Sequence, residues 1–377
     1  MKFIGQMKRA LLFTAAAFAL CMSAAGQDRA DRQDLTREGG STMILLGDPQ
    51  GYEKYDINQG IFEICTAWIR DNAAHLNIKA VLCTGDLVEQ NDNNALNRRM
   101  LNQTSRQMWA SVSRAFERID GVVPYVTSPG NHDYGFKASE DIHTFYPDWF
   151  PAERQGAALL DVLVSEHPNR EGRASLENCA TRYSLPGWDH DILVITAEFC
   201  PSDAVLEWAK GLCEKYSDDW VIFLTHSYMK CAGRCGNELY ATAERYPLSQ
   251  QEGNNYGQQI WDKLVYEVPN LRLVLCGHHG HSDFRQTHKD NYADNMGWRE
   301  DRNRAGKNVG QMMFNVQTLG DGWEGNGGDG WLRILEFLPD GKTMKVRTYS
   351  PLFGISPLTK HLSRLTDPMN EFEFIFD

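Results

Sequence analysis

Five short apolar runs divide the chain at residues 43–46, 81–84, 122–126, 221–224 and 273–276. Continuous apolar runs of this length are typical of buried strands. Each run leads into polar residues of the kinds that bind metals. In chain order these are Asp48-Pro49-Gln50, Gly85-Asp86, Gly130-Asn131-His132-Asp133, Thr225-His226 and Gly277-His278-His279. A polar residue directly after such a strand lies in the crevice at the carboxyl end of the sheet, where α/β proteins bind ligands.

Helical spacing of apolar residues separates these strands and predicts helices at 58–76, 105–118, 203–216 and 258–266. Further strands are predicted at 181–185, 192–195, 312–316, 332–337 and 345–348, with a hairpin turn at Asp340-Gly341. The alternation of strand and helix indicates a mixed α/β fold with parallel crossovers. Residues 282–310 are polar and charged, and we interpret them as a long surface loop around Trp298. Residues 134–178 are interpreted as an insertion over the strand ends, whose aromatic rings mostly pack within the insertion.

The first 41 residues have the layout of an export signal followed by a lead-in. Lys2, Lys8 and Arg9 precede an apolar run at 10–20, and small residues follow at 23–26. This layout predicts a signal peptide over 1–26, a flexible lead-in over 27–41, one domain over 42–377, and a secreted or periplasmic protein. Anchoring as a lipoprotein through Cys21 is disfavoured because Leu20 fits that signal poorly. No other stretch is long and apolar enough to span a membrane.

The net charge bears on which partners the protein can bind, and the cysteine content bears on whether it forms disulfides. The chain has a formal net charge of −12, which disfavours nucleic acid and anionic membranes as partners. Nine cysteines are present. An exported chain permits disulfides, and Cys231 and Cys235 are the best candidates because only three residues separate them. Cys83 and Cys276 lie within apolar runs and are interpreted as inert core thiols.

The residues after the five strands suit divalent metals. Carboxylate and amide oxygens together with imidazoles are the donors that a pair of catalytic divalent metals requires. Taken singly, each residue has a simpler explanation: Asp48 and Asp86 as helix caps, Asn131 as a turn residue, or His226 as a buried core histidine. Five such motifs in one order favour the metal site.

This order of motifs resembles the calcineurin-like metallophosphoesterases, in the branch that has Gln in place of the usual first His. The resemblance continues through residues 328–333 and 348–351, so it covers nearly the whole chain after the leader. It implies a two-sheet β-sandwich flanked by helices, with the metal site at the carboxyl ends of the strands. It also implies a metal-dependent hydrolase, a phosphatase or phosphodiesterase that acts on a small-molecule or protein phosphoester.

The resemblance assigns roles to individual residues. It implies two divalent ions, Mn, Fe or Zn, that share a hydroxide which attacks phosphorus in line. Asp86 would bridge the ions, and Asp48 and Gln50 would bind the first. The ligands of the second would be Asn131, His226 and His278. His132 would act on the leaving oxygen, and Asp133 would orient His132.

Two departures from the family pattern affect the first metal. Gln50 is a weaker ligand than the usual histidine, and Gly280 occupies the position of the second histidine in the last motif. His279 or His281 would then replace it, and His281 is favoured because Gly280 lets the backbone turn. A first site degraded in this way leaves open a non-catalytic binding protein on the same fold, although Asn131, His132 and Asp133 argue for an enzyme.

Overall fold

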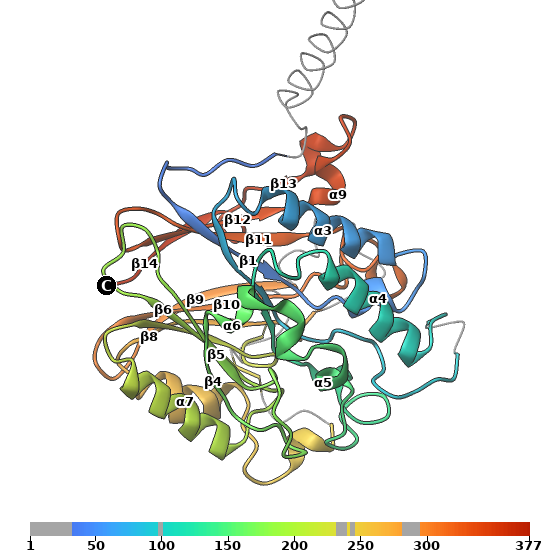
Figure 1. The fold of residues 1–377 in the computed structure, drawn as a ribbon, viewed down its shortest axis with the longest axis horizontal. Coiled ribbons are helices and arrows are strands. Elements are labelled where there is room, and N and C mark those ends of the chain that lie inside the picture. The colour runs from blue at the N-terminus through green and yellow to red at the C-terminus, as the bar shows by residue number, and fades with distance from the viewer. Residues whose placement is uncertain (1–31, 97–100, 231–239, 242–245, 281–294) are drawn as a thin grey trace, which may run out of the picture.

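The computed structural model describes residues 32–96, 101–230, 240–241, 246–280 and 295–377 (Figure 1). The predicted signal peptide, Cys21, the Cys231–Cys235 pair and His281 therefore lie outside the described residues. Within the described part of the chain, no helix is long and apolar enough to cross a membrane.

Two sheets form the centre of the molecule, and each has seven strands among the described residues. The first sheet has the order β13-β12-β11-β1-β2-β3, with β14 paired to β12. Its strands are β1 (Ser41–Leu46), β2 (Ile78–Cys83), β3 (Tyr125–Thr127), β11 (Leu332–Phe337), β12 (Thr343–Tyr349), β13 (Arg364–Leu365) and β14 (Phe372–Ile375). Strands β1, β2 and β3 are parallel, whereas β11 to β14 join by antiparallel pairing.

The second sheet has the order β4-β5-β6-β7-β8-β10-β9. Its strands are β4 (Leu163–Glu166), β5 (Cys179–Tyr183), β6 (Ile192–Thr196), β7 (Trp220–Leu224), β8 (Leu271–Cys276), β9 (Met296–Arg302) and β10 (Asn308–Phe314). Strands β6, β7, β8 and β10 are parallel. Alternate residues of β6 serve different cores: Ile192 and Val194 face the core between the sheets, and Leu193 and Ile195 face the outer helices.

Helices cover the outer face of each sheet (Figure 1). The helices beside the first sheet are α2 (Gln50–Glu53), α3 (Gln59–Asn72), α4 (Ser105–Glu117) and α9 (Pro351–Gly354). The helices beside the second sheet are α7 (Asp203–Lys215) and α8 (Gly257–Ile260). Helix α8 continues as a π-helical turn over Trp261–Val265. Helix α4 begins at a capping box, in which Thr104 and Gln107 bond each other's backbone amides. Together the layers confirm a mixed α/β fold of two sheets flanked by helices.

The insertion holds the short helices α5 (Tyr146–Trp149) and α6 (Ala157–Leu160) and strand β4. Tyr134 and Tyr146 are fully buried, but both pack against residues outside the insertion, against the expectation. Tyr134 clusters with Phe199, Cys200 and Leu248, and Tyr146 lies in the main core, where its hydroxyl accepts from the Thr127 hydroxyl at 2.8 Å. Phe136 is about half exposed. The end of the predicted lead-in is tied to the first sheet, because the Thr36 hydroxyl donates to Glu336 of β11 at 2.8 Å and Ser41 already belongs to β1.

The prediction of a loop around Trp298 is wrong. The described part of that segment forms the antiparallel hairpin β9–β10, and the Trp298 ring packs 4.5 Å from that of Phe372 on β14. Strand β9 is the edge of its sheet, so its charged side chains reach solvent and hide the apolar alternation on which the prediction depended. The Asp340-Gly341 turn is confirmed, with Gly341 at a φ of 76°.

Candidate metal centre

The two sheets contribute to one site at the carboxyl ends of their parallel strands. Asp48, Asp86 and Asn131 follow β1, β2 and β3 of the first sheet. His226 and His278 follow β7 and β8 of the second sheet. All of these side chains are buried except that of His278, which is partly exposed.

Four of the predicted ligands meet around one atom, Nε2 of His226. This nitrogen lies 3.3 Å from Asp86 Oδ2, 3.1 Å from Asn131 Oδ1 and 3.2 Å from His278 Nδ1. Asp86, His226 and His278 form a group whose ligand atoms all lie within 4.8 Å of one another. Donor atoms that share one first-row metal are about 3 Å apart, because each is about 2.1 Å from the ion. The spacing therefore fits a metal ion.

Hydrogen bonds orient these donors. The Nδ1 atom of His226 lies 2.7 Å from the Thr84 carbonyl, which can only accept, so Nε2 is left to bind a metal. Asp48 accepts from the Thr84 hydroxyl at 2.6 Å and from the His278 backbone amide at 2.9 Å. Ligands fixed in this way from behind are typical of metal sites.

Gln50 lies beside this group with one half of its amide held. Its Nε2 donates to Glu89 Oε2 at 3.2 Å, and its backbone amide donates to the Asp86 carbonyl at 2.9 Å. Its Oε1 is buried and has no hydrogen-bond partner among the described residues. An orphaned buried oxygen is costly unless something binds it, so Gln50 fits a ligand of a second ion together with Asp48.

The backbone around the ligands adopts unusual conformations. Asp86 has a φ of 50° and His278 a φ of 69°, in the left-handed region that costs most side chains about 1–3 kcal/mol. A Cβ atom on Gly130 would lie 2.1 Å from Asp86 Oδ1. The glycine of the Gly-Asn-His-Asp motif is therefore required by the close approach of the Asp86 carboxylate.

Burial and crowding shift the pKa values of the site. Burial raises the pKa of Asp48 to about 7, with His226 acting against it and Asp86 adding to it. Burial also opposes ionisation of Asp86, but His226 and His132 hold the pKa of that carboxyl below its usual range. Burial lowers the pKa of His226 and the two carboxylates raise it, to about 9 overall. The raised pKa values mean that Asp48 and His226 keep protons in the absence of a metal. A divalent cation bound at the site would replace these protons and neutralise the carboxylate charges instead.

His132 and Asp133 do not interact as expected. The His132 ring places Nδ1 2.7 Å from the Glu89 carbonyl, whereas Asp133 accepts from the backbone amides of Gly130 and Val88 at 2.7 and 3.1 Å. The three residues Asn131–Asp133 form one 3₁₀ turn, in which neighbouring side chains point about 120° apart. Asp133 therefore holds the loop, and Glu89 orients His132.

Sequence reasoning missed three supporting residues. Thr84 and Glu89 bond the ligands as described above, and the Phe199 ring lies 5.9 Å from the His226 ring and 6.0 Å from the His278 ring. Thr84 and Glu89 stand within three residues of Asp86, which was the available signal. Phe199 follows β6, a strand that carries no metal-type residue. The alternative ligand His279 has its ring 4.7 Å from that of His278.

Comparison with known protein families identifies the family of this chain. A family model described as calcineurin-like phosphoesterase matches residues 42–281, which is more than half of the chain. The chain belongs to the calcineurin-like phosphoesterase family. The resemblance is thereby confirmed for the family, and the branch with Gln in place of the first His stays a prediction.

This member of the family resembles both curated proteins and solved structures. It is 27% identical over 312 residues to the uncharacterized protein YvnB of Bacillus subtilis (strain 168), covering 82% of this chain and 20% of that protein. The chain thus spans about a fifth of the length of that relative. Among solved structures, GAP50, the anchor in the inner membrane complex of Plasmodium, has a TM-score of 0.43 at 12% identity and 84% and 86% coverage. A 5'-nucleotidase precursor from Thermus thermophilus has a TM-score of 0.41 at 12% identity and 82% and 54% coverage.

Proposed function

We propose that this protein is an exported metal-dependent phosphoesterase that hydrolyses a phosphomonoester or phosphodiester. The observation that carries the proposal is the meeting of Asp86, Asn131, His226 and His278 donors within 3.3 Å of one nitrogen atom. Both sheets contribute to this group, and family membership makes phosphoester chemistry the natural use of it.

The residues divide into metal ligands and a group that acts on the substrate. Asp86, Asn131, His226 and His278 would hold one ion, and Asp48 and Gln50 would hold a second, with Asp86 between them. Divalent metal bound there supplies Lewis-acid polarisation of the phosphoryl group and water that ionises near neutral pH.

His132 would act on the leaving group. Because the Glu89 carbonyl can only accept, Nδ1 of His132 carries the hydrogen and Nε2 is the nitrogen open to substrate. When Nε2 is protonated, it donates that proton to the leaving oxygen as the phosphorus–oxygen bond breaks. The alcohol and phosphate, or a phosphomonoester from a diester, are then the products.

The test is hydrolysis of 4-nitrophenyl phosphate and bis(4-nitrophenyl) phosphate by the purified protein with Mn²⁺, Zn²⁺ or Fe²⁺ added. Activity on at least one ester that requires metal and is lost in Asp86→Asn is expected. A folded, metal-loaded protein without activity on either ester or on a wider phosphoester panel would instead favour a binding protein on the same fold. Export is tested by the mass of the protein recovered from its native host, which should begin near Gln27.

A further inference from the structure

Lys54 is a buried cation without a counter-ion. The residue is 4% exposed, and among the described residues no carboxylate lies within 4.0 Å of Nζ and no acceptor bonds to it. Its nearest groups are two aromatic rings, with Nζ 5.8 Å from the centre of Tyr55 and 5.9 Å from that of Trp323. Cation–π contacts are weaker than a charge-assisted hydrogen bond, so the Lys54 ammonium group can still take an anionic partner.

The Lys54 side chain lies on the same side of its helix as Gln50. The Lys54 backbone amide donates to the Gln50 carbonyl at 3.1 Å, as in a helical turn. Residues four apart in a helix share a face, and their side chains lean toward the N-terminal end. Lys54 thus leans toward the end of α2 where Gln50 meets Glu89 and Asp86.

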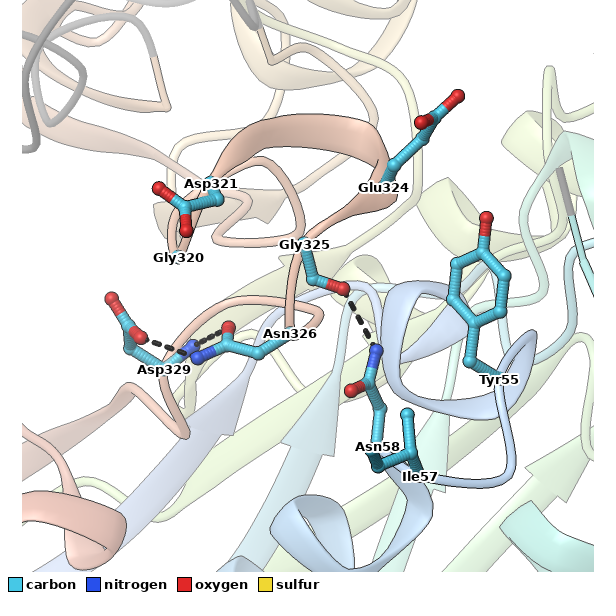
Figure 2. Close-up of a pocket in the computed structure, with 9 residues that line it drawn as sticks. All are labelled: Tyr55, Ile57, Asn58, Gly320, Asp321, Glu324, Gly325, Asn326 and Asp329. Atoms are coloured by element: carbon cyan, nitrogen blue, oxygen red, sulfur yellow. Dashed lines mark hydrogen bonds between the residues drawn. The ribbon is translucent and has the colours of Figure 1, made fainter. Parts of the chain in front are cut away.

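The opposite wall is held firmly in place. Residues 320–330 carry Trp323, and they approach α2 so closely that a Cβ on Gly51 would lie 2.9 Å from the Gly327 Cα. The Asn58 side chain also donates to the Gly325 carbonyl at 2.8 Å (Figure 2). The segment that carries Trp323 is therefore packed closely against α2, and the Trp323 ring holds a fixed position beside Lys54.

Beyond Tyr55 lies a pocket of about 430 Å³ with a different chemistry. Figure 2 shows Tyr55, Glu324 and Asp321 around it. Its acidic side chains would repel an anion, so this pocket suits a neutral, hydroxyl-bearing group. Lys54 lies against Tyr55, which lines this pocket, and against Trp323, which precedes the pocket residue Glu324, so its positive charge adjoins the acidic pocket.

We propose that Lys54 is a specificity-determining residue that binds a second anionic group on the leaving group of the substrate. That group would bind on the α2 side of the metal centre, one helical turn after Gln50 along the chain. A phosphate or a carboxylate meets this requirement, and the uncharged remainder of the leaving group occupies the pocket. The assignment rests on the proposed phosphoesterase function and narrows its substrates to phosphoesters with a second negative charge.

The experiment measures binding, so that it does not depend on turnover. Calorimetry on the Mn²⁺-loaded protein compares 4-phosphonobutyrate with butylphosphonate, which differ by a terminal carboxylate and resist hydrolysis. Wild type, Lys54→Met and Lys54→Arg are compared. Lys263→Met is the control, because it removes the same charge from a half-exposed lysine that pairs with Asp203 beside the second sheet. Thermal melts establish that each variant is folded.

Wild type and Lys263→Met are expected to bind 4-phosphonobutyrate about 10-fold or more tightly than butylphosphonate, the range for a charge-assisted hydrogen bond. Lys54→Met should bind the two compounds equally, and Lys54→Arg should retain most of the preference. Equal binding by wild type, or a preference that survives in Lys54→Met, overturns the assignment. Binding of neither compound overturns the phosphoryl site of the proposed function, and this subsite with it.

Discussion

At the scale of single residues, the metal centre depends on places where the chain leaves no room for a side chain. A Cβ atom on Gly277 would lie 2.1 Å from Asp48 Oδ1 and 2.6 Å from the Thr84 hydroxyl oxygen. Contacts under 3 Å force something to move, and here both neighbours belong to the centre. The absence of a side chain at Gly277 therefore allows the Gly-His motif after β8 to pack directly against Asp48 of the first motif.

Gly277→Ala should weaken metal binding by about 10–100-fold, the usual effect of disturbing the groups that orient ligands. The measurement is metal affinity by calorimetry beside metal content by mass spectrometry. Gly211→Ala is the control, since a Cβ on that helical glycine meets no heavy atom within 4 Å. It should bind metal as wild type does and be about 1 kcal/mol more stable. Unchanged affinity in Gly277→Ala would show that Asp48 can shift without cost to the site.

His132→Ala should lower kcat by about 10²–10⁴-fold, the range for a positioned proton donor, without loss of metal. The reason is that the His132 ring bonds the Glu89 carbonyl and stands outside the group of four donors. The measurement is kcat for esters of alcohols with different pKa values, beside metal content. The defect should shrink for leaving groups of low pKa, which need no proton. Loss of metal with activity would make His132 a ligand instead.

The sequence predicts that Asp86, Asn131, His226 and His278 come together, as they do in the structure, because each follows an apolar run long enough to indicate a strand. It was not sufficient to pair His132 with Glu89 instead of Asp133. That pairing depends on the roughly 120° steps of a single 3₁₀ turn, which no local pattern of apolar residues reports. Lys54 was missed for a related reason, since its lack of a counter-ion is visible only when its neighbours are known.

At the scale of elements, the insertion holds the segment that packs against both histidine ligands. Arg170 donates to the Phe199 and Cys200 carbonyls at 3.1 and 2.7 Å and lies 3.2 Å from Glu198 Oε1. Glu198 is 1% exposed. A buried carboxylate of this kind is strongly destabilising once its partner is removed, so Arg170 links the insertion to the segment after β6.

Arg170→Met should lower the free energy of unfolding by about 3–5 kcal/mol, because it leaves Glu198 buried without its cation. Urea unfolding at neutral pH measures this loss. The double variant Arg170→Met with Glu198→Gln should recover part of it. Arg304→Met removes an arginine from an exposed pair with Glu267 and should change stability by at most about 1 kcal/mol. Equal small losses in both arginine variants would show that the insertion is held by other contacts.

Helices and strands could be predicted from the sequence where their burial gives the apolar residues a regular spacing. The ranges of β1, β2, β8, α4 and α7 agree with the predicted segments to within a few residues. Strand β9 was not predictable, because an edge strand exposes one face and its charges interrupt the apolar alternation. Nor does any period predict that β11 pairs with β1, a contact between strands at opposite ends of the described chain.

At the scale of the whole molecule, the candidate metal centre connects the two sheets, because both contribute residues to it. Asp48, Asp86 and Asn131 extend from the first sheet, and His226 and His278 extend from the second. A metal held by all of them binds the sandwich together at the edge where the two sets of strands end. Metal binding should therefore raise the free energy of unfolding of the whole protein, because an ion that binds only the folded chain shifts the unfolding equilibrium toward the folded state.

Removing metal with a chelator should lower the Tm of the whole protein in a single transition. At free metal about 1,000 times the Kd, the folded state gains about 4 kcal/mol, and the chelator removes that gain. Calorimetric melts with and without EDTA measure it, and Asp86→Asn should melt at one temperature under both conditions. Gln50→His should raise the Tm in added metal, because imidazole binds borderline metals better than an amide does. A wild-type Tm that ignores both chelator and added metal would contradict a centre shared by the two sheets.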